Sequence, residues 1–112
     1  MPVGDRARLL AAYRALGDLV NASTLSVYVV PDLTDREREV LTAAAAGLEE
    51  QEIGEYLCIS NRTARGHMFA ISKKMGTRNR TQSAVLGLLS GVISEREVAQ
   101  LMVQVYPHLT AD

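Results

Sequence analysis

Apolar side chains recur at helical spacing along most of the chain, and short polar or glycine-containing breaks separate the apolar stretches. Spacings of three and four residues bring side chains to one face of an α-helix, so each stretch predicts an amphipathic helix. Residues 25–30 are rich in β-branched side chains, and apolar and polar positions alternate weakly among them. For residues 21–30 the pattern therefore leaves three possibilities, a short strand, an extended linker or a continued helix. The pattern predicts an all-α fold with helices at about residues 5–20, 35–47, 50–57, 61–75, 80–90 and 95–106.

Cap signals mark the starts of two of these helices. Thr34 stands three residues before Glu37, which is the capping-box spacing, and Leu33 precedes it where a hydrophobic staple would pack. Ser94 and Glu97 show the same capping-box spacing at the start of the last helix. For the helix at 61–75, the cap is either Ser60 or Asn61. In the helix at 80–90, the side chains expected to face inward are Ala84, Leu88 and Leu89.

The helix at 61–75 divides into two faces. At about 100° per residue, the apolar face consists of Ala64, Met68, Ile71 and Met75. The opposite face carries Arg62, Arg65, Gly66, Phe69 and Lys73. A short helix and a tight turn at 58–60 precede it, which is the helix-turn-helix pattern. We expect Arg65 to bind guanine and Phe69 to meet a thymine methyl; a lone surface aromatic and a chance glycine at Gly66 are the alternatives.

Length and composition restrict the class of protein. The 112 residues suit one domain, and 47% apolar with 22% charged residues suits a small aliphatic core. Cys58 is the only cysteine, and His67 and His108 have no companion nucleophile or ligand cluster, so we expect no enzyme, no metal and no cofactor. The start lacks signal-peptide features and no apolar run would span a bilayer, so we expect a cytoplasmic protein without a membrane partner.

The distribution of charge matters more than its sum. The formal net charge is −1, yet residues 57–93 contain no Asp or Glu. The cations in that segment are Arg62, Arg65, Lys73, Lys74, Arg78 and Arg80. Because exposed charges act over only about 8–10 Å in physiological salt, local charge decides phosphate binding. The alternative is an ordinary solvated basic face.

Many spaced positions form a longer motif. They are the run Leu33-Thr34-Asp35-Arg36-Glu37-Arg38-Glu39-Val40-Leu41, then Gly47-Leu48, Glu52-Ile53, Leu57, Ile59-Ser60, Thr63, His67, Ile71, Lys74, Gly76, Arg78, Arg80-Thr81-Gln82 and Gly91-Val92-Ile93. This set resembles the LuxR/GerE/NarL helix-turn-helix family. The resemblance implies a four-helix DNA-binding domain at residues 33–93, whose third helix enters the major groove. It also implies a transcription regulator of the bacterial cytosol or nucleoid that usually binds as a dimer.

The resemblance also assigns roles by position. Base reading falls to Arg65, Gly66 and Phe69, with Arg62 beside them. Phosphate contacts or groove-flanking positions fall to Thr63, Lys73, Arg78 and Arg80, and we expect the neighbouring Lys74 to contact phosphate as well. For Glu37 we expect either an ion pair with Arg80 across helices or two separate surface charges. For His67 we favour a structural hydrogen bond over a base contact.

The second helix departs from the family pattern. It opens Leu48-Glu49-Glu50-Gln51-Glu52, where the family commonly has Ser-Asn-Lys-Glu, so Gln51 replaces a phosphate-contacting cation and stands beside extra carboxylates. We expect weaker nonspecific affinity for DNA, and any DNA contact from this helix is in doubt. Ala64 and Ser83-Ala84 are smaller departures from the pattern.

Apolar stripes outside residues 33–93 predict a homodimer. The arm at 1–32 offers Leu9, Tyr13 and Leu16, and the amphipathic helix at 94–112 offers Leu101, Met102 and Val105. Exposed stripes of this size are unusual on a soluble monomer. The alternative is that both terminal helices pack within one chain. Because residues 1–32 are too few for a receiver or ligand-sensing domain, we expect a stand-alone regulator.

These features favour a sequence-specific regulator that binds double-stranded DNA. A dimer would read an inverted repeat through the helix at 61–75. RNA polymerase or another regulator is a further possible partner. The main alternative is a helix-turn-helix adaptor or antagonist that captures another regulator, which the acidic second helix favours slightly. A module like region 4 of sigma factors fits less well at the Gly47-Leu48 and His67 positions.

Overall fold

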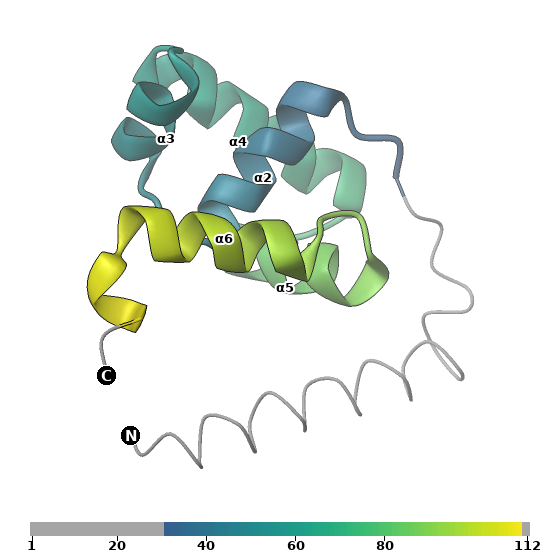
Figure 1. The fold of residues 1–112 in the computed structure, drawn as a ribbon. Coiled ribbons are helices and arrows are strands. Elements are labelled where there is room, and N and C mark those ends of the chain that lie inside the picture. The colour runs from purple at the N-terminus through teal and green to yellow at the C-terminus, as the bar shows by residue number, and fades with distance from the viewer. Residues whose placement is uncertain (1–30, 111–112) are drawn as a thin grey trace. The chain divides into compact units, whose positions relative to one another are not determined.

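The structure, a computed structural model, describes residues 31–110. This part of the chain is all-α, as the sequence predicts (Figure 1). Its helices are α2 (Asp35–Ala45), α3 (Glu50–Leu57), α4 (Asn61–Met75), α5 (Arg80–Ser90), α6 (Glu95–Val105) and the short 3-10 helix η2 (Pro107–Thr110). The predicted helix at 5–20, the open segment at 21–30 and the side chains Leu9, Tyr13 and Leu16 lie outside the described residues.

Helix α2 is the centre of the packing. It contacts α3, α4, α5 and α6 (Figure 1). Val40, Leu41 and Ala43 on it are fully buried. The core around it is aliphatic, as the scarcity of aromatic residues requires. Its other members include Leu48, Ile53, Ala64, Met68, Ile71, Met75 and Ile93.

The predicted caps are present. The Thr34 hydroxyl accepts from the N–H of Glu37 at 3.1 Å, and the Glu37 carboxylate accepts from the N–H of Thr34 at 2.8 Å. Ser60, rather than Asn61, caps α4 by accepting from the N–H of Thr63 at 2.9 Å. These bonds satisfy orphan N–H groups in the first turns, so the local sequence fixes where α2 and α4 begin.

The inner face of α5 agrees with the prediction only in part. Leu88 is partly buried and packs against the core as expected, but the fully buried residues of α5 are Ser83 and Gly87, and Ala84 and Leu89 are only partly buried. A Cβ added to Gly87 would lie 3.0 Å from Cδ2 of Leu41, so the missing side chain allows α5 to lie close to α2. The apolar pattern did not predict Ser83 and Gly87 on this face, because one is polar and the other has no side chain.

Helix α6 packs into the same compact unit, Pro31–Asp112, as the helix-turn-helix. Val98 and Leu101 are buried in the shared core, and Met102 and Val105 are partly buried against it. The stripe of α6 is therefore covered by its own chain. Leu101, Met102 and Val105 therefore do not form an exposed stripe, and for the C-terminal helix this agrees with the alternative of packing within one chain; the N-terminal helix of that alternative lies outside the described residues.

Candidate nucleic-acid interface

The turn between α3 and α4 sets the direction of α4. Cys58 ends α3 in the left-handed conformation, at φ 58°, and the N–H of Ile59 donates to the carbonyl of Gly54 at 2.9 Å. A Cβ on Gly54 would lie 2.7 Å from the carbonyl oxygen of Ile59, closer than real Cβ atoms come to other atoms. Gly54 is therefore required by the close approach of the turn, a role that the sequence alone did not reveal.

Helix α4 has the two predicted faces. Its inner face buries Ala64, Met68, Ile71 and Met75. On its outer face Arg62, Arg65, Gly66, Phe69 and Lys73 are all exposed. Phe69 is 65% exposed, which is high for a large apolar side chain. A Cβ on Gly66 would meet no atom within 4 Å, so the backbone at this position is open to an incoming surface.

Several predicted site residues line one hollow of about 410 Å³. Its cations are Arg65, Lys73, Arg78 and Arg80, and it also includes Phe69 and Glu50. The Nζ atom of Lys73 lies 5.1 Å from the centroid of the Phe69 ring, within reach of a cation–π interaction. The hollow combines several positive side chains with an exposed aromatic ring. Such a surface suits a polyanionic ligand that also carries planar rings or methyl groups.

Arg62, Thr63 and Gly66 do not line this hollow. Arg62 is exposed in the first turn of α4, and Gly66 is exposed on the same helix. The hydroxyl of Thr63 lies 2.8 Å from that of Ser60, so Thr63 takes part in the cap of α4. These three residues flank the hollow along the chain rather than line it.

Glu50 is the residue that the site prediction missed. Its Oε2 lies 3.1 Å from Nε of Arg65, and the ion pair joins the first turn of α3 to the outer face of α4. The sequence showed an acidic second helix, but nothing in it indicated which carboxylate would reach Arg65. The side chain of Glu50 is 33% exposed and that of Arg65 is 67% exposed.

Glu37 pairs with Lys74 and not with Arg80. The Nζ of Lys74 donates to Oε1 of Glu37 at 2.6 Å, and Glu37 is only 5% exposed. Burial raises the pKa of the Glu37 carboxyl, but the hydrogen bond and charge of Lys74 and the N–H of Thr34 outweigh burial and hold this pKa below its ordinary value. The pair links the start of α2 to the last turns of α4. It also occupies the ammonium group of Lys74, which was expected to contact a DNA phosphate.

Arg80 caps the end of α2. Its Nη2 donates to the carbonyl of Leu48 and, at 3.4 Å, to that of Ala44, while Nη1 lies 3.4 Å from Oε2 of Glu49. Most of its guanidinium therefore serves the domain itself. Arg78 is exposed, and its backbone N–H donates to the side chain of Gln82 at 2.8 Å.

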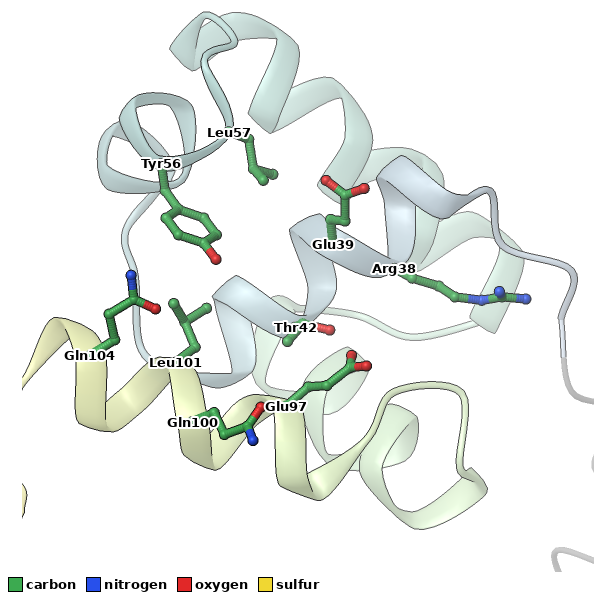
Figure 2. Close-up of a pocket in the computed structure, with 9 residues that line it drawn as sticks. All are labelled: Arg38, Glu39, Thr42, Tyr56, Leu57, Glu97, Gln100, Leu101 and Gln104. Carbon is green, nitrogen blue, oxygen red and sulfur yellow. The ribbon is translucent and has the colours of Figure 1, made fainter.

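A second hollow, of about 350 Å³, lies between α2, α3 and α6 and shares no residue with the first (Figure 2). Figure 2 shows Tyr56 of α3 pointing toward Gln104 and Leu101 of α6, and Leu57 of α3 on the side of Glu39 of α2. Tyr56 is 47% exposed. The basic surface of α4 is thus separate from the surface where α6 packs.

Three further expectations concern the described residues alone. The side chain of His67 is half-buried and makes no hydrogen bond within residues 31–110, so the structural hydrogen bond expected for it is not present there. Within residues 31–110, no group of three His, Cys, Asp or Glu side chains is placed to hold a metal ion. Every helix of that range is too short or too polar to cross a bilayer.

Comparison with known proteins identifies the family. Residues 31–86 match the model of the bacterial regulatory proteins of the luxR family. Over 62 residues the chain is 42% identical to the transcriptional activator protein BjaR1 of Bradyrhizobium diazoefficiens, covering 55% of this chain and 26% of that protein. It is 43% identical over 61 residues to the transcriptional regulatory protein LnrK of Bacillus subtilis, covering 54% and 28%.

A third relative aligns over a longer stretch. The transcriptional activator protein AhyR of Aeromonas hydrophila is 36% identical over 77 residues, covering 69% of this chain and 29% of AhyR. The matched segment thus spans between a quarter and a third of each relative's length. The family match at residues 31–86 covers α2, α3, the turn and α4, and it ends within α5. The chain therefore belongs to the LuxR family and carries its helix-turn-helix DNA-binding domain, a non-enzymatic regulatory fold.

Proposed function

We propose that the protein is a sequence-specific transcription regulator that places α4 in the major groove of double-stranded DNA. The observation that carries the proposal is the outer face of α4, where Arg65, Phe69 and Lys73 are exposed together. An α-helix fits the major groove, where base edges differ in their donors, acceptors and methyl groups. The regulatory names of the relatives agree with this function.

The exposed residues divide into two proposed roles. Arg65 donates two hydrogen bonds to O6 and N7 of a guanine, and Phe69 packs on a thymine methyl, with Arg62 and Gly66 close to the bases. Lys73 and Arg78 bind phosphates, because both are exposed at the edge of the same hollow. Thr63 belongs to the start of the helix, whose N–H groups also favour a phosphate.

Lys74 and Arg80 have a weaker claim on phosphate. The ammonium of Lys74 is held by the buried Glu37, and the guanidinium of Arg80 is held by two backbone carbonyls at the end of α2. Releasing Lys74 for DNA would leave the buried Glu37 carboxylate without its counter-charge, and releasing Arg80 would remove a donor from the carbonyls of Ala44 and Leu48. We therefore assign both residues to positioning α4 and α2 beneath the DNA.

We further propose a homodimer that binds an inverted repeat. Two copies related by a two-fold axis would set two α4 helices about 34 Å apart, one turn of DNA. Two-fold symmetry of the protein then demands the same symmetry of the site. Such a regulator acts in the cytoplasm, with RNA polymerase or another regulator as a further partner.

The adaptor function is the second candidate, and the acidic α3 favours it. Glu49, Glu50, Glu52 and Glu55 all belong to or cap this helix, which lies directly against α4. Their charge would repel phosphates near the reading helix. An adaptor or antagonist would use the domain to bind another regulator and would not need DNA.

Selection of bound duplexes from a random DNA pool tests the proposal. A regulator enriches a common sequence, and fluorescence anisotropy then measures its affinity for the enriched duplex and for a scrambled duplex across salt concentrations. We expect log K to fall linearly with log salt, because phosphate contacts release counterions. If no sequence is enriched and duplexes from the unselected pool do not bind even at low salt, the proposed function is wrong and the adaptor is the better candidate.

A further inference from the structure

We propose that Glu50 is a specificity-determining residue, which holds Arg65 in the orientation for guanine and repels phosphate from the same place. The inference rests on the proposed function and adds to it a residue outside the reading helix. Glu50 touches Arg65 and not the DNA, so it acts as a positioning residue. Its effect is on the choice between sequences rather than on total affinity.

The contact geometry leaves the base-reading end of Arg65 available. A guanidinium has five N–H donors in a planar fork, and the carboxylate of Glu50 contacts Arg65 through Nε, at 3.1 Å. The two terminal Nη groups lie at the far end of the plane from Cδ. That end matches O6 and N7 of guanine, the two acceptors that arginine bonds as a pair. Glu50 therefore fixes the plane of the guanidinium before DNA arrives.

Preorganisation matters at this residue because Arg65 is otherwise unconstrained. Its side chain is 67% exposed, and holding a long exposed side chain in one rotamer loses conformational freedom. Glu50 is itself anchored on the first turn of α3 and is only 33% exposed, so it is the more fixed partner. The pair is built across two helices whose relative position is set by the tight turn at 58–60, which packs closely against Gly54 of α3.

The charge of Glu50 adds a second discrimination. Glu50 is the one carboxylate among the side chains that line the basic hollow. A phosphate drawn to Arg65 from misaligned DNA would approach this carboxylate and be repelled, whereas a neutral guanine edge would not be. Repulsion against the wrong contact is a usual way to build specificity. Glu50 thus lowers nonspecific affinity while it supports the specific contact.

The test compares variants of the full chain on two DNA probes. The probes are a duplex enriched from a random pool and its scrambled version, and the variants are Glu50→Ala and the control Glu55→Ala on the same helix. For Glu50→Ala we expect scrambled-duplex affinity to rise about threefold at low salt. We expect the ratio of enriched to scrambled affinity to fall about fivefold or more, as the loss of one oriented base contact predicts.

Two further variants separate the parts of the proposal. Glu50→Gln removes the charge but keeps an oxygen that can accept from Arg65. It should therefore raise affinity for the scrambled duplex as much as Glu50→Ala does, but lower the ratio of enriched to scrambled affinity less. In an Arg65→Ala background, Glu50→Ala should leave the ratio unchanged, because no guanidinium remains to be oriented. Thermal unfolding of each variant, followed by circular dichroism, verifies that the fold is kept.

The outcomes distinguish this inference from the proposed function. A wild-type protein that prefers the enriched duplex, with a ratio that Glu50→Ala leaves unchanged, overturns the inference and keeps the function. If Glu50→Ala and Glu55→Ala lower the ratio of enriched to scrambled affinity equally, the inference is also overturned, since the effect would then come from the general charge of α3. A wild-type protein without sequence preference overturns both.

Discussion

Arg65 and Lys73 stand two turns apart on one face of α4, yet their proposed contacts predict different losses. Arg65→Ala removes a base contact, so affinity for the enriched duplex should fall by about 1–3 kcal/mol and preference at one base pair should relax. Lys73→Ala removes a phosphate contact, so affinity for all duplexes should fall alike and the salt slope should decrease by about one. Anisotropy titrations over a salt series measure both. Unchanged enriched-duplex affinity in Arg65→Ala would show that this face does not read bases.

Glu37 makes stability depend on pH. Because the pKa of its carboxyl is lower in the folded protein than its ordinary value of 4.5, ionised Glu37 stabilises the fold above that pH. This stabilisation is lost as the pH falls through the lowered pKa. The free energy of unfolding should therefore decrease between about pH 5 and 3 more steeply in the wild type than in Glu37→Gln. Urea unfolding at several pH values measures it; parallel curves would contradict the assignment.

At the scale of the element, two glycines in neighbouring helices should respond oppositely to the same change. Gly54→Ala places a Cβ 2.7 Å from the carbonyl of Ile59 in the turn, so it should lower the free energy of unfolding by about 1–3 kcal/mol. Gly66→Ala meets no atom and removes backbone freedom, so it should raise that free energy by about 0.5–1 kcal/mol. Urea unfolding of both variants compares them.

Gly66→Ala also tests how close α4 comes to DNA. If the backbone at Gly66 approaches the base edges, the added methyl should weaken enriched-duplex binding although the protein itself is more stable. A more stable variant with unchanged affinity would mean that the glycine has no role in DNA contact. The two measurements separate folding from binding at one position.

The helix boundaries followed from the sequence because their causes are local. Thr34, Ser60 and Ser94 cap α2, α4 and α6 through N–H groups three residues onward, so the sequence window contains the whole interaction. The two faces of α4 followed in the same way, from periodicity. On α5 periodicity predicted Leu88, which packs against the core, but not Gly87, which is buried because its missing side chain leaves room for Leu41.

The pairing of charges was outside the reach of sequence patterns. Glu37 and Lys74 are 37 residues apart, and Arg65 and Glu50 are 15 residues apart, so only the packing of the helices decides which charges meet. The expected Glu37–Arg80 pair was correct in that Glu37 pairs across helices, but its partner is Lys74 and not Arg80. Lys74 and Arg80 were likewise expected to contact phosphate, Arg80 by its family position, and in the structure both side chains make contacts within the domain.

At the scale of the whole molecule, the dimer proposal now depends on residues 1–32. Leu101 is only 6% exposed in the core of its own domain, so Leu101→Asp buries an unpaired charge and should unfold the protein rather than separate two copies. The exposed Val103 offers the matched control on α6, and Val103→Asp should keep the fold. An interface built mainly by α6 would instead make Val103→Asp monomeric.

Leu9 and Leu16 share the apolar stripe predicted for residues 5–20, and replacing both with Asp tests the arm directly. If the arm joins two copies, the double variant should sediment as a monomer at concentrations where the wild type is a dimer. Its helical circular-dichroism signal should persist, because the compact unit Pro31–Asp112 contains its own core. It should also bind an inverted repeat no better than a half-site, since the advantage of two sites depends on linkage between the two reading helices. Wild-type protein that sediments as a monomer at tens of micromolar would exclude the dimer and leave a regulator that reads single half-sites.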